Sequence, residues 1–140
     1  MHDATWSNGL APSVFEQIVR SMPEAVIVAD EAGVIRMWNP GAQALFGFSA
    51  AEALGRDLHL IVPEKMRPAH DDGFRRALAS GHLRVQGKVM TTRSLHKDGV
   101  PLYVDFTFSL LKDGHGVTRG VVAIGRDATA RRREESVKAR

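Results

Sequence analysis

Residues 83–124 place the strongest constraint on the fold, because three strand-like stretches there are separated by two short turns. The turns, His96–Gly99 and Lys112–Gly116, both contain Asp-Gly, a dipeptide that favours hairpins. The middle stretch alternates regularly, so its large side chains fall on one face of a strand: Val104, Phe106 and Phe108. The region therefore predicts an antiparallel meander of three strands.

Two shorter strands are predicted nearer the N-terminus, over 25–29 and 34–38, joined by the tight turn Asp30-Glu-Ala-Gly33. Two short helices follow, the first ended by Gly47 and the second opened by Ser49. These elements predict a hairpin that leads into a cluster of short helices.

Two more helices complete the prediction. An amphipathic helix capped by Ser13 precedes the first strand, and a longer helix that carries His70 ends at Ser80-Gly81. Five antiparallel strands with helices segregated between them predict an α+β fold, with the helices covering one face of the sheet.

The length of 140 residues favours one domain. We expect a flexible leader over 1–12, a folded domain over 13–130 and the basic start of a C-terminal helix or linker over 131–140. No apolar run approaches the roughly 18–20 residues of a membrane span, and the start lacks signal-peptide features, so we expect a cytoplasmic protein. The absence of cysteine excludes disulfides, thiolate metal sites and flavin photochemistry that needs a cysteine adduct.

The net charge of +3 is concentrated at the C-terminal end. Residues 131–140 hold five basic and two acidic side chains, which accounts for the whole excess. A nucleic-acid surface needs clustered basic residues on a folded element, and the remaining 130 residues offer none. We therefore predict neither a nucleic-acid nor a membrane partner.

His70 is the most informative single residue, because it lies on an apolar helix face. At helical spacing that face consists of His70, Phe74, Ala77 and Leu78. Burying an unpaired polar ring costs about 1–3 kcal/mol. The imidazole is therefore either a satisfied core histidine or the ligand of a bound group.

The order of elements, together with several short motifs, resembles the PAS domain family across residues 13–130. The motifs are Asp30-Glu-Ala-Gly33, Trp38-Asn-Pro40, Leu45-Phe-Gly47, Lys97-Asp-Gly99 and Gly125-Arg-Asp-Ala-Thr129. The resemblance implies the PAS fold and a sensory or regulatory domain rather than an enzyme. In agreement, the chain has no Gly-x-Ser-x-Gly elbow, phosphate-cradling loop or His-Glu-x-x-His pair.

A closer resemblance is to the haem-binding oxygen sensors of this family, through Pro63-Glu64, Arg67-Pro-Ala-His70, Arg84-Val-Gln-Gly87 and Lys97-Asp-Gly99. It implies haem b as cofactor, His70 as the proximal iron ligand, and O2, CO or NO, or the haem redox state, as the signal. Iron held by one histidine keeps its other axial position available for a gas.

Two residues of the first meander strand, Lys88 and Met90, are predicted to share a face. In members of the subgroup, an arginine at the position of Met90 binds oxygen, or a methionine at the position of Lys88 ligates iron. This chain has neither residue in its usual place. A thioether cannot donate a proton, so Met90 is either a sixth iron ligand or core lining. Lys88 either extends to solvent or reaches the bound gas as a donor.

The resemblance also assigns the remaining site residues. Val85, Phe106 and Phe108 match the apolar lining on the gas side, and Arg76 and Arg84 match the partners of the haem propionates. Two other interpretations stay open: a flavin or small organic ligand with Trp38 or Asn39 in its pocket, and a ligand-free module.

His82, just past the helix, is a second candidate imidazole or a solvent-exposed residue. His59, His96 and His115 are predicted in loops or turns, and no two histidines show the i, i+4 spacing of a helical metal site. Asp71-Asp72 is predicted to complement the helix dipole.

Partners follow from the same resemblance. We expect a homodimer through the N-terminal helix and a sheet face. We also expect a signal that passes along the last strand to Asp127-Ala-Thr129 and the helix beyond Arg131, toward an output domain or a partner protein.

Overall fold

A computed structural model describes residue 9 and residues 11–139, so most of the leader predicted over 1–12 lies outside the described residues. The strands are β1 (Ala25–Asp30), β2 (Ile35–Trp38), β3 (Met90–Leu95), β4 (Pro101–Lys112) and β5 (Thr118–Asp127). The helices are α1 (Pro12–Ser21), α2 (Pro40–Phe46), α3 (Ala50–Ala53), α4 (Arg67–Ser80) and α5 (Thr129–Lys138), with 3₁₀ turns η1 (Leu58–Ile61) and η2 (Glu64–Met66).

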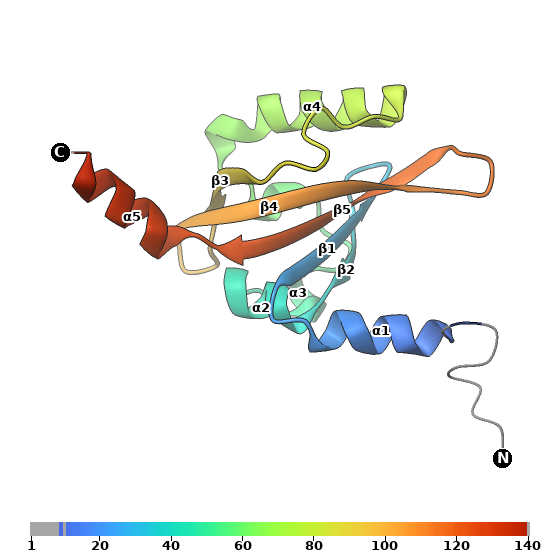
Figure 1. The fold of residues 1–140 in the computed structure, drawn as a ribbon, viewed down its shortest axis with the longest axis horizontal. Coiled ribbons are helices and arrows are strands. Elements are labelled where there is room, and N and C mark those ends of the chain that lie inside the picture. The colour runs from blue at the N-terminus through green and yellow to red at the C-terminus, as the bar shows by residue number, and fades with distance from the viewer. Residues whose placement is uncertain (1–8, 10, 140) are drawn as a thin grey trace, which may run out of the picture.

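The strands form one antiparallel sheet in the order β2-β1-β5-β4-β3, so the last strand in sequence lies at the centre (Figure 1). Ile27 of β1 pairs with Ala123 of β5, which pairs with Phe108 of β4. The α+β class, the five antiparallel strands and the meander over β3, β4 and β5 are thereby confirmed.

The core lies on the sheet face that carries Ile27, Ala123 and Phe106, called the inner face here. Phe46 of α2 is fully buried against it, with its ring centroid 5.5 Å from Trp38 and 6.4 Å from Phe106. The predicted one-faced alternation of β4 is confirmed, since Val104 and Phe106 are buried and Phe108 packs beside them.

Asn39, at the end of β2, joins three elements. Its side-chain Oδ1 accepts from the backbone N–H of Val26 (2.8 Å) and caps α2 by accepting from Ala42 (2.9 Å). Its Nδ2 donates to the carbonyls of Val19 (2.9 Å) and Glu24 (3.0 Å). All hydrogen-bonding positions of this buried amide are used, which fixes α1, β1 and α2 relative to one another.

Two boundaries differ from the sequence-based expectation. The first meander strand begins at Met90 rather than Leu83, because residues 84–87 form turns closed by backbone bonds such as Lys88 N–H to Val85 O (3.0 Å). The cap of α1 is Ala11, with Pro12 at the first helical position, rather than Ser13. Proline is favoured there because its missing N–H would have no partner.

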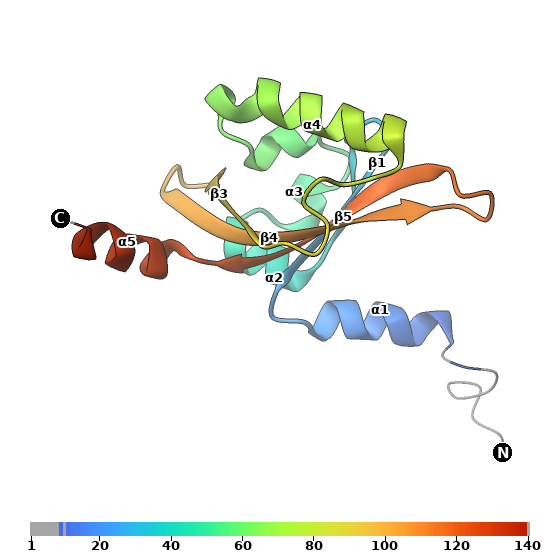
Figure 2. The same cartoon turned by 45° about the horizontal axis from the view of Figure 1, so that its top comes forward.

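Helix α4 lies alongside the sheet in both views, whereas α1 and α5 extend from opposite ends of the molecule (Figures 1 and 2). Helix α5 is attached to β4: Arg131 donates to Asp105 Oδ1 (2.9 Å) and to Thr91 Oγ1 (3.2 Å). Thr129 Oγ1 accepts from the backbone N–H of Tyr103 (3.0 Å). Among the described residues, no helix has both the length and the apolar character needed to cross a membrane.

Candidate functional site

His70 lies in the first half of α4, on the face predicted from the sequence. Its side chain is 32% exposed, and its ring stacks on Phe74 with the centroids 6.1 Å apart. Nδ1 donates to Asp71 Oδ1 (3.2 Å), whereas Nε2 has no hydrogen-bond partner among the described residues. The imidazole is therefore neither a fully buried core residue nor bonded to a backbone carbonyl, and one nitrogen remains available to a ligand.

A second imidazole, that of His59, lies against His70. Asp57 caps η1 by accepting from the backbone N–H of His59 (2.8 Å), which turns the His59 side chain toward α4. Its Nε2 donates to Asp71 Oδ1 (2.7 Å), and the two imidazole centroids are 6.1 Å apart. Hydrogen bonds from His59 and then His70 lower the pKa of the Asp71 carboxyl. We call these three residues the His–Asp–His cluster.

The cluster borders a hollow of about 290 Å³ between α4, η1 and the β1–β2 turn. Small-molecule sites usually have volumes of roughly 300–1,000 Å³, so this hollow is at the lower end of that range. Its walls include Gly33, Leu58, Phe74 and Leu78 beside the cluster. A ligand larger than this volume would extend out of the hollow or displace one of its walls.

The predicted sheet-side residues form a second group. Met90, at the start of β3 and 37% exposed, pairs with Phe106 across the β3–β4 ladder, so both lie on the inner face. Phe106 is buried and stacks on the half-buried Phe108 at 5.3 Å between centroids. Among the described residues, none of these three lines the hollow beside His70.

The remaining predicted residues are near the surface. Arg84 and Val85 lie in the turns after α4, with Arg84 exposed and Val85 half-buried. Lys88 is exposed and precedes β3, so its predicted place on a strand face with Met90 was wrong: the strand starts two residues later. Arg76 is exposed and pairs with Asp72 along the same helix.

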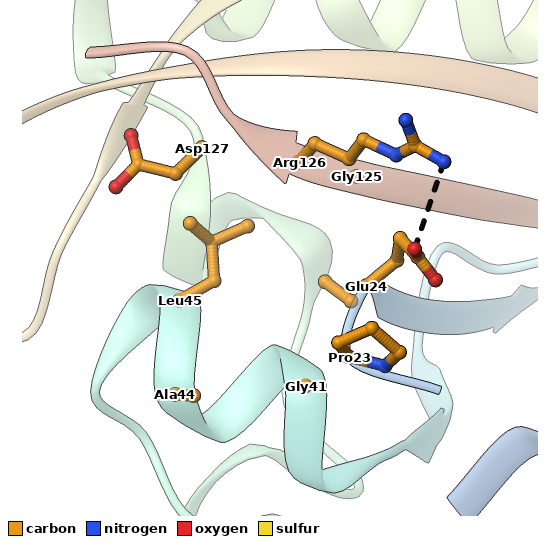
Figure 3. A pocket seen from close by; sticks show the side chains of 9 residues that line it. Pro23, Glu24, Gly41, Ala44, Leu45, Gly125, Arg126 and Asp127 are labelled. Atoms are coloured by element: carbon orange, nitrogen blue, oxygen red, sulfur yellow. Dashed lines mark ion pairs between the residues drawn. The ribbon is translucent and has the colours of Figure 1, made fainter. Parts of the chain in front are cut away.

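A separate hollow of about 320 Å³ lies between α2 and the end of β5 (Figure 3). Glu24 and Arg126 face each other across it at 3.6 Å, and Asp127 lies at its edge. Its lining contains no imidazole or thioether. It therefore offers no soft or nitrogen ligand to a metal or haem.

The two residues considered for an organic-ligand pocket are used internally. Trp38 is buried, and its Nε1 donates to the carbonyl of Phe48 (2.8 Å). The amide of Asn39 has no free donor or acceptor. Neither polar group is available to a ligand in this arrangement.

The residues present fit a flat apolar group that carries a metal, such as haem. The imidazole of His70 supplies a free nitrogen, and α4 has only Ala77 fully buried. Phe74 and Leu78, which a packed helix would bury, are only half-buried, as is Phe108 on the sheet. This incompletely buried apolar surface on both sides is what an inserted apolar group would cover.

Sequence reasoning missed His59 and Asp71 as parts of one cluster. Asp71 is adjacent to His70, but no local pattern could have found His59, which precedes His70 by eleven positions and lies in a different element. The association depends on how η1 folds against α4. The remaining predicted roles of the site residues stay predictions.

Residues 19–133 match the family described as the PAS fold. The chain is 28% identical to the sensor protein FixL of Bradyrhizobium diazoefficiens over 99 residues, which are 69% of this chain and 19% of FixL. It is 28% identical to the oxygen sensor protein DosP of Escherichia coli over 95 residues, 68% of this chain and 12% of DosP. The chain thus spans about a fifth or less of the length of these relatives.

Among solved structures, an RNA-binding light-oxygen-voltage receptor is similar to this chain, with a TM-score of 0.74 and 24% identity. The match covers 94% of this chain and 37% of that one. At this identity the likeness shows the fold.

Proposed function

Because this chain belongs to the PAS fold family, we propose that it is a haem-binding sensor domain in which His70 is the proximal ligand of haem b. Bound haem iron supplies an axial position for O2, CO or NO, or a change of redox state. The resemblance to FixL and DosP, the latter an oxygen sensor by name, supports the proposal.

The observation that carries the proposal is the free Nε2 of His70 on a helix that is incompletely packed against its sheet. A neutral imidazole is a common iron ligand, and its other nitrogen is usually held by a hydrogen bond. Asp71 provides that bond to Nδ1 at 3.2 Å. The ring is therefore oriented with the ligating atom directed away from Asp71.

The sheet residues have their roles on the opposite side of the cofactor. We assign Phe106, Phe108 and Val85 to the apolar wall of the gas side, which would exclude water. Met90, beside Phe106 on the inner face, is assigned as the sixth ligand of ferrous haem. Lys88 is exposed, and we assign it to solvent.

Arg76 and Arg84 are assigned to the two propionates, as charge-assisted partners. Both are exposed, as residues at the mouth of such a site must be. A propionate would replace Asp72 as the partner of Arg76.

The proposed signal from the ligand site to α5 starts with a displacement of Phe106. This residue pairs with Gly125 of β5, and a Cβ at Gly125 would lie 2.9 Å from its ring. Displacement of Phe106 therefore acts directly on β5, which continues into Asp127 and α5. We propose that the signal passes along this strand to an output domain or partner protein.

The test is the absorption spectrum of the protein expressed with haem supply, in ferric, ferrous and ferrous-plus-CO forms, for wild type and His70→Ala. We expect a Soret band that moves on reduction and again with CO, and that His70→Ala loses. His82→Ala, which changes an exposed histidine, is the control and should keep the band. A colourless wild type that also fails to take up haemin would exclude haem.

The role of Met90 has its own test, Met90→Leu, which keeps the volume and removes the sulfur. We expect the ferrous spectrum to change from six- to five-coordinate. An unchanged six-coordinate spectrum would mean that Met90 is not an iron ligand and only lines the core.

A flavin or small organic ligand is the second candidate, favoured by the likeness to the light-oxygen-voltage receptor. With no cysteine in the chain, a flavin here could not form a cysteine adduct. The colour of the purified protein separates the two candidates.

We also propose a homodimer through α1 and the outer sheet face, because Phe15 and Ile18 are 55% and 46% exposed. Introducing Asp at both positions should produce monomers in light scattering. Unchanged dimers would exclude this surface.

A further inference from the structure

We propose that the His–Asp–His cluster is a binding site for a divalent transition-metal ion of the zinc class, distinct from haem. Each of the three residues offers one ligand atom, and these atoms all lie within 4.8 Å of one another. The atoms that face one another across the hydrogen bonds are Nε2 of His59, Nδ1 of His70 and Oδ1 of Asp71.

The spacing of the ligand atoms is close to that of a coordinated ion. Oδ1 of Asp71 is 2.7 Å from His59 Nε2 and 3.2 Å from His70 Nδ1. Zinc bonds of about 2.0–2.1 Å in a tetrahedron separate neighbouring ligand atoms by about 3.3 Å. An ion would therefore replace the two bridging protons with small rotations of the side chains.

A carboxylate behind one of the ligands supports the assignment. Asp57 Oδ1 lies 3.6 Å from Nδ1 of His59, the nitrogen opposite the proposed ligand atom. Metal-bound histidines generally direct their second nitrogen at a carboxylate or carbonyl, which fixes the tautomer. The His59 ring thus lies between the Asp57 carboxylate and Asp71, to which Nε2 donates.

The donor set and its exposure select the kind of ion. Two imidazoles and one carboxylate suit zinc, nickel, cobalt or copper, whereas calcium and magnesium prefer oxygen ligands only. The three side chains are 32–45% exposed, so an ion in the hollow can reach them and keep a fourth position for water.

Occupancy of this site would link η1 to α4, because His59 belongs to η1 and the other two ligands to α4. Haem that displaces α4 from η1 would have to break this link. The ion would also take Nδ1 of His70. We infer that bound metal slows the uptake of haem, a consequence that rests on the proposed function, whereas metal binding itself does not.

The first experiment titrates the haem-free, chelator-treated full chain with zinc by calorimetry and with cobalt by visible absorption. Wild type should bind one ion per chain, with the ligand-field bands of tetrahedral cobalt. His59→Ala should weaken binding at least tenfold. His82→Ala and His115→Ala change exposed histidines outside the cluster and should bind like wild type.

Equal affinity of wild type and His59→Ala would overturn the site, as would loss of binding in either control. Circular dichroism and the melting temperature of each variant show whether it is folded. Asp71→Asn, which keeps the size of the side chain, serves as a second ligand variant, and it too should bind at least tenfold more weakly.

The second experiment measures the rate of haemin uptake with and without zinc. Zinc should slow uptake by wild type and leave the rate of His59→Ala unchanged, because the latter retains His70 and lacks the site. Equal slowing of both proteins would overturn the linkage. Failure of wild type to take up haemin without zinc would instead remove the proposed function and leave the metal titration standing.

Discussion

Helices α2 and α4 both pack beside the sheet, yet they are held in different ways. Helix α2 begins at the fully bonded amide of Asn39, buries Gly41, Ala42 and Phe46, and approaches β1 so closely that only glycine fits at position 41. Both helices border a hollow, but α4 has only Ala77 fully buried.

The difference separates two tasks within one small domain. The α2 side uses backbone hydrogen bonds and buried apolar contacts to fix the helix against the sheet. The α4 side places the polar groups of the His–Asp–His cluster, His70 among them, beside a hollow. Segments with few buried contacts open locally at low free energy, and ligand-binding segments are drawn from them.

The largest effect should come from exchanging glycine for alanine in the two helices. A Cβ at Gly41 would lie 2.8 Å from the carbonyl oxygen of Pro23 and closer still to that of Glu24, both backbone atoms that cannot yield cheaply. Gly41→Ala should cost at least the 1–3 kcal/mol typical of overpacking.

Gly73→Ala in α4 meets nothing within 4 Å and should stabilise the protein by about 0.5–1 kcal/mol, the helix preference for alanine. Urea denaturation of both variants measures the contrast. Similar midpoints would mean that the two helices are equally constrained.

Asn39→Ala should have the next largest effect. It leaves the buried N–H of Val26 without its side-chain partner, at a cost of about 1–3 kcal/mol, whereas the part-buried carbonyl of Glu24 can bond water instead. The matched change in α4 is Asp72→Asn, which removes an exposed pair with Arg76. Such pairs contribute little, so its denaturation midpoint should stay at that of wild type.

Hydrogen exchange should distinguish the helices without any mutation. Backbone amides of α4 should exchange through local opening, well before those of α2, because opening α4 exposes less apolar surface. If the haem proposal holds, binding of haem should slow hydrogen exchange of the α4 amides and leave exchange of the α2 amides unchanged. Equal protection of both helices in the haem-free protein would contradict the comparison.

The smallest effect concerns Glu52 of α3, whose carboxylate bonds Lys97 in the β3–β4 turn at 2.6 Å. This hydrogen bond, the largest cause, and one from the Ser49 N–H lower the Glu52 pKa from 4.5 to about 2. Because the folded-state pKa is lowered, the pair stabilises the fold above pH 4.5 and its contribution is lost as the pH falls toward 2. In an NMR titration, Lys97→Ala should raise the Glu52 pKa toward 4.5.

The fold was largely predictable because its signals are local. The Asp30–Gly33 and His96–Gly99 turns and the alternation of β4 each depend on neighbours in sequence. The start of β3 was not predictable from the sequence. Residues 84–87 alternate polar and apolar side chains as a strand would, yet they form turns that end at Gly87, whose φ is 77°. The residue pattern alone does not show whether these residues form a strand or turns.

The site was predictable only where a single helix carries it. His70 was found from its place on the apolar face of α4, whereas His59 was predicted in a loop or turn and Asp71 was assigned to the helix dipole. The contact of Asp71 with His70 is between neighbours in sequence, but its contact with His59 is tertiary, because His59 reaches Asp71 only when η1 packs against α4. Nothing in the spacing of the three residues encodes that geometry.

The central strand, β5, is also the strand that runs into α5, and α5 is attached to β4 through Arg131 and Asp105. The length of α5 therefore sets the direction in which any following segment extends, since each residue added to the helix rotates that direction by about 100° about the helix axis. If the helix continues, inserting one, two, three or four residues after Lys138 would rotate an appended reporter by about 100°, 200°, 300° and 400°, slightly more than one full turn. If the reporter signal varies periodically with the number of inserted residues, the orientation set by α5 carries the signal. If the signal only falls steadily, α5 acts only as a spacer.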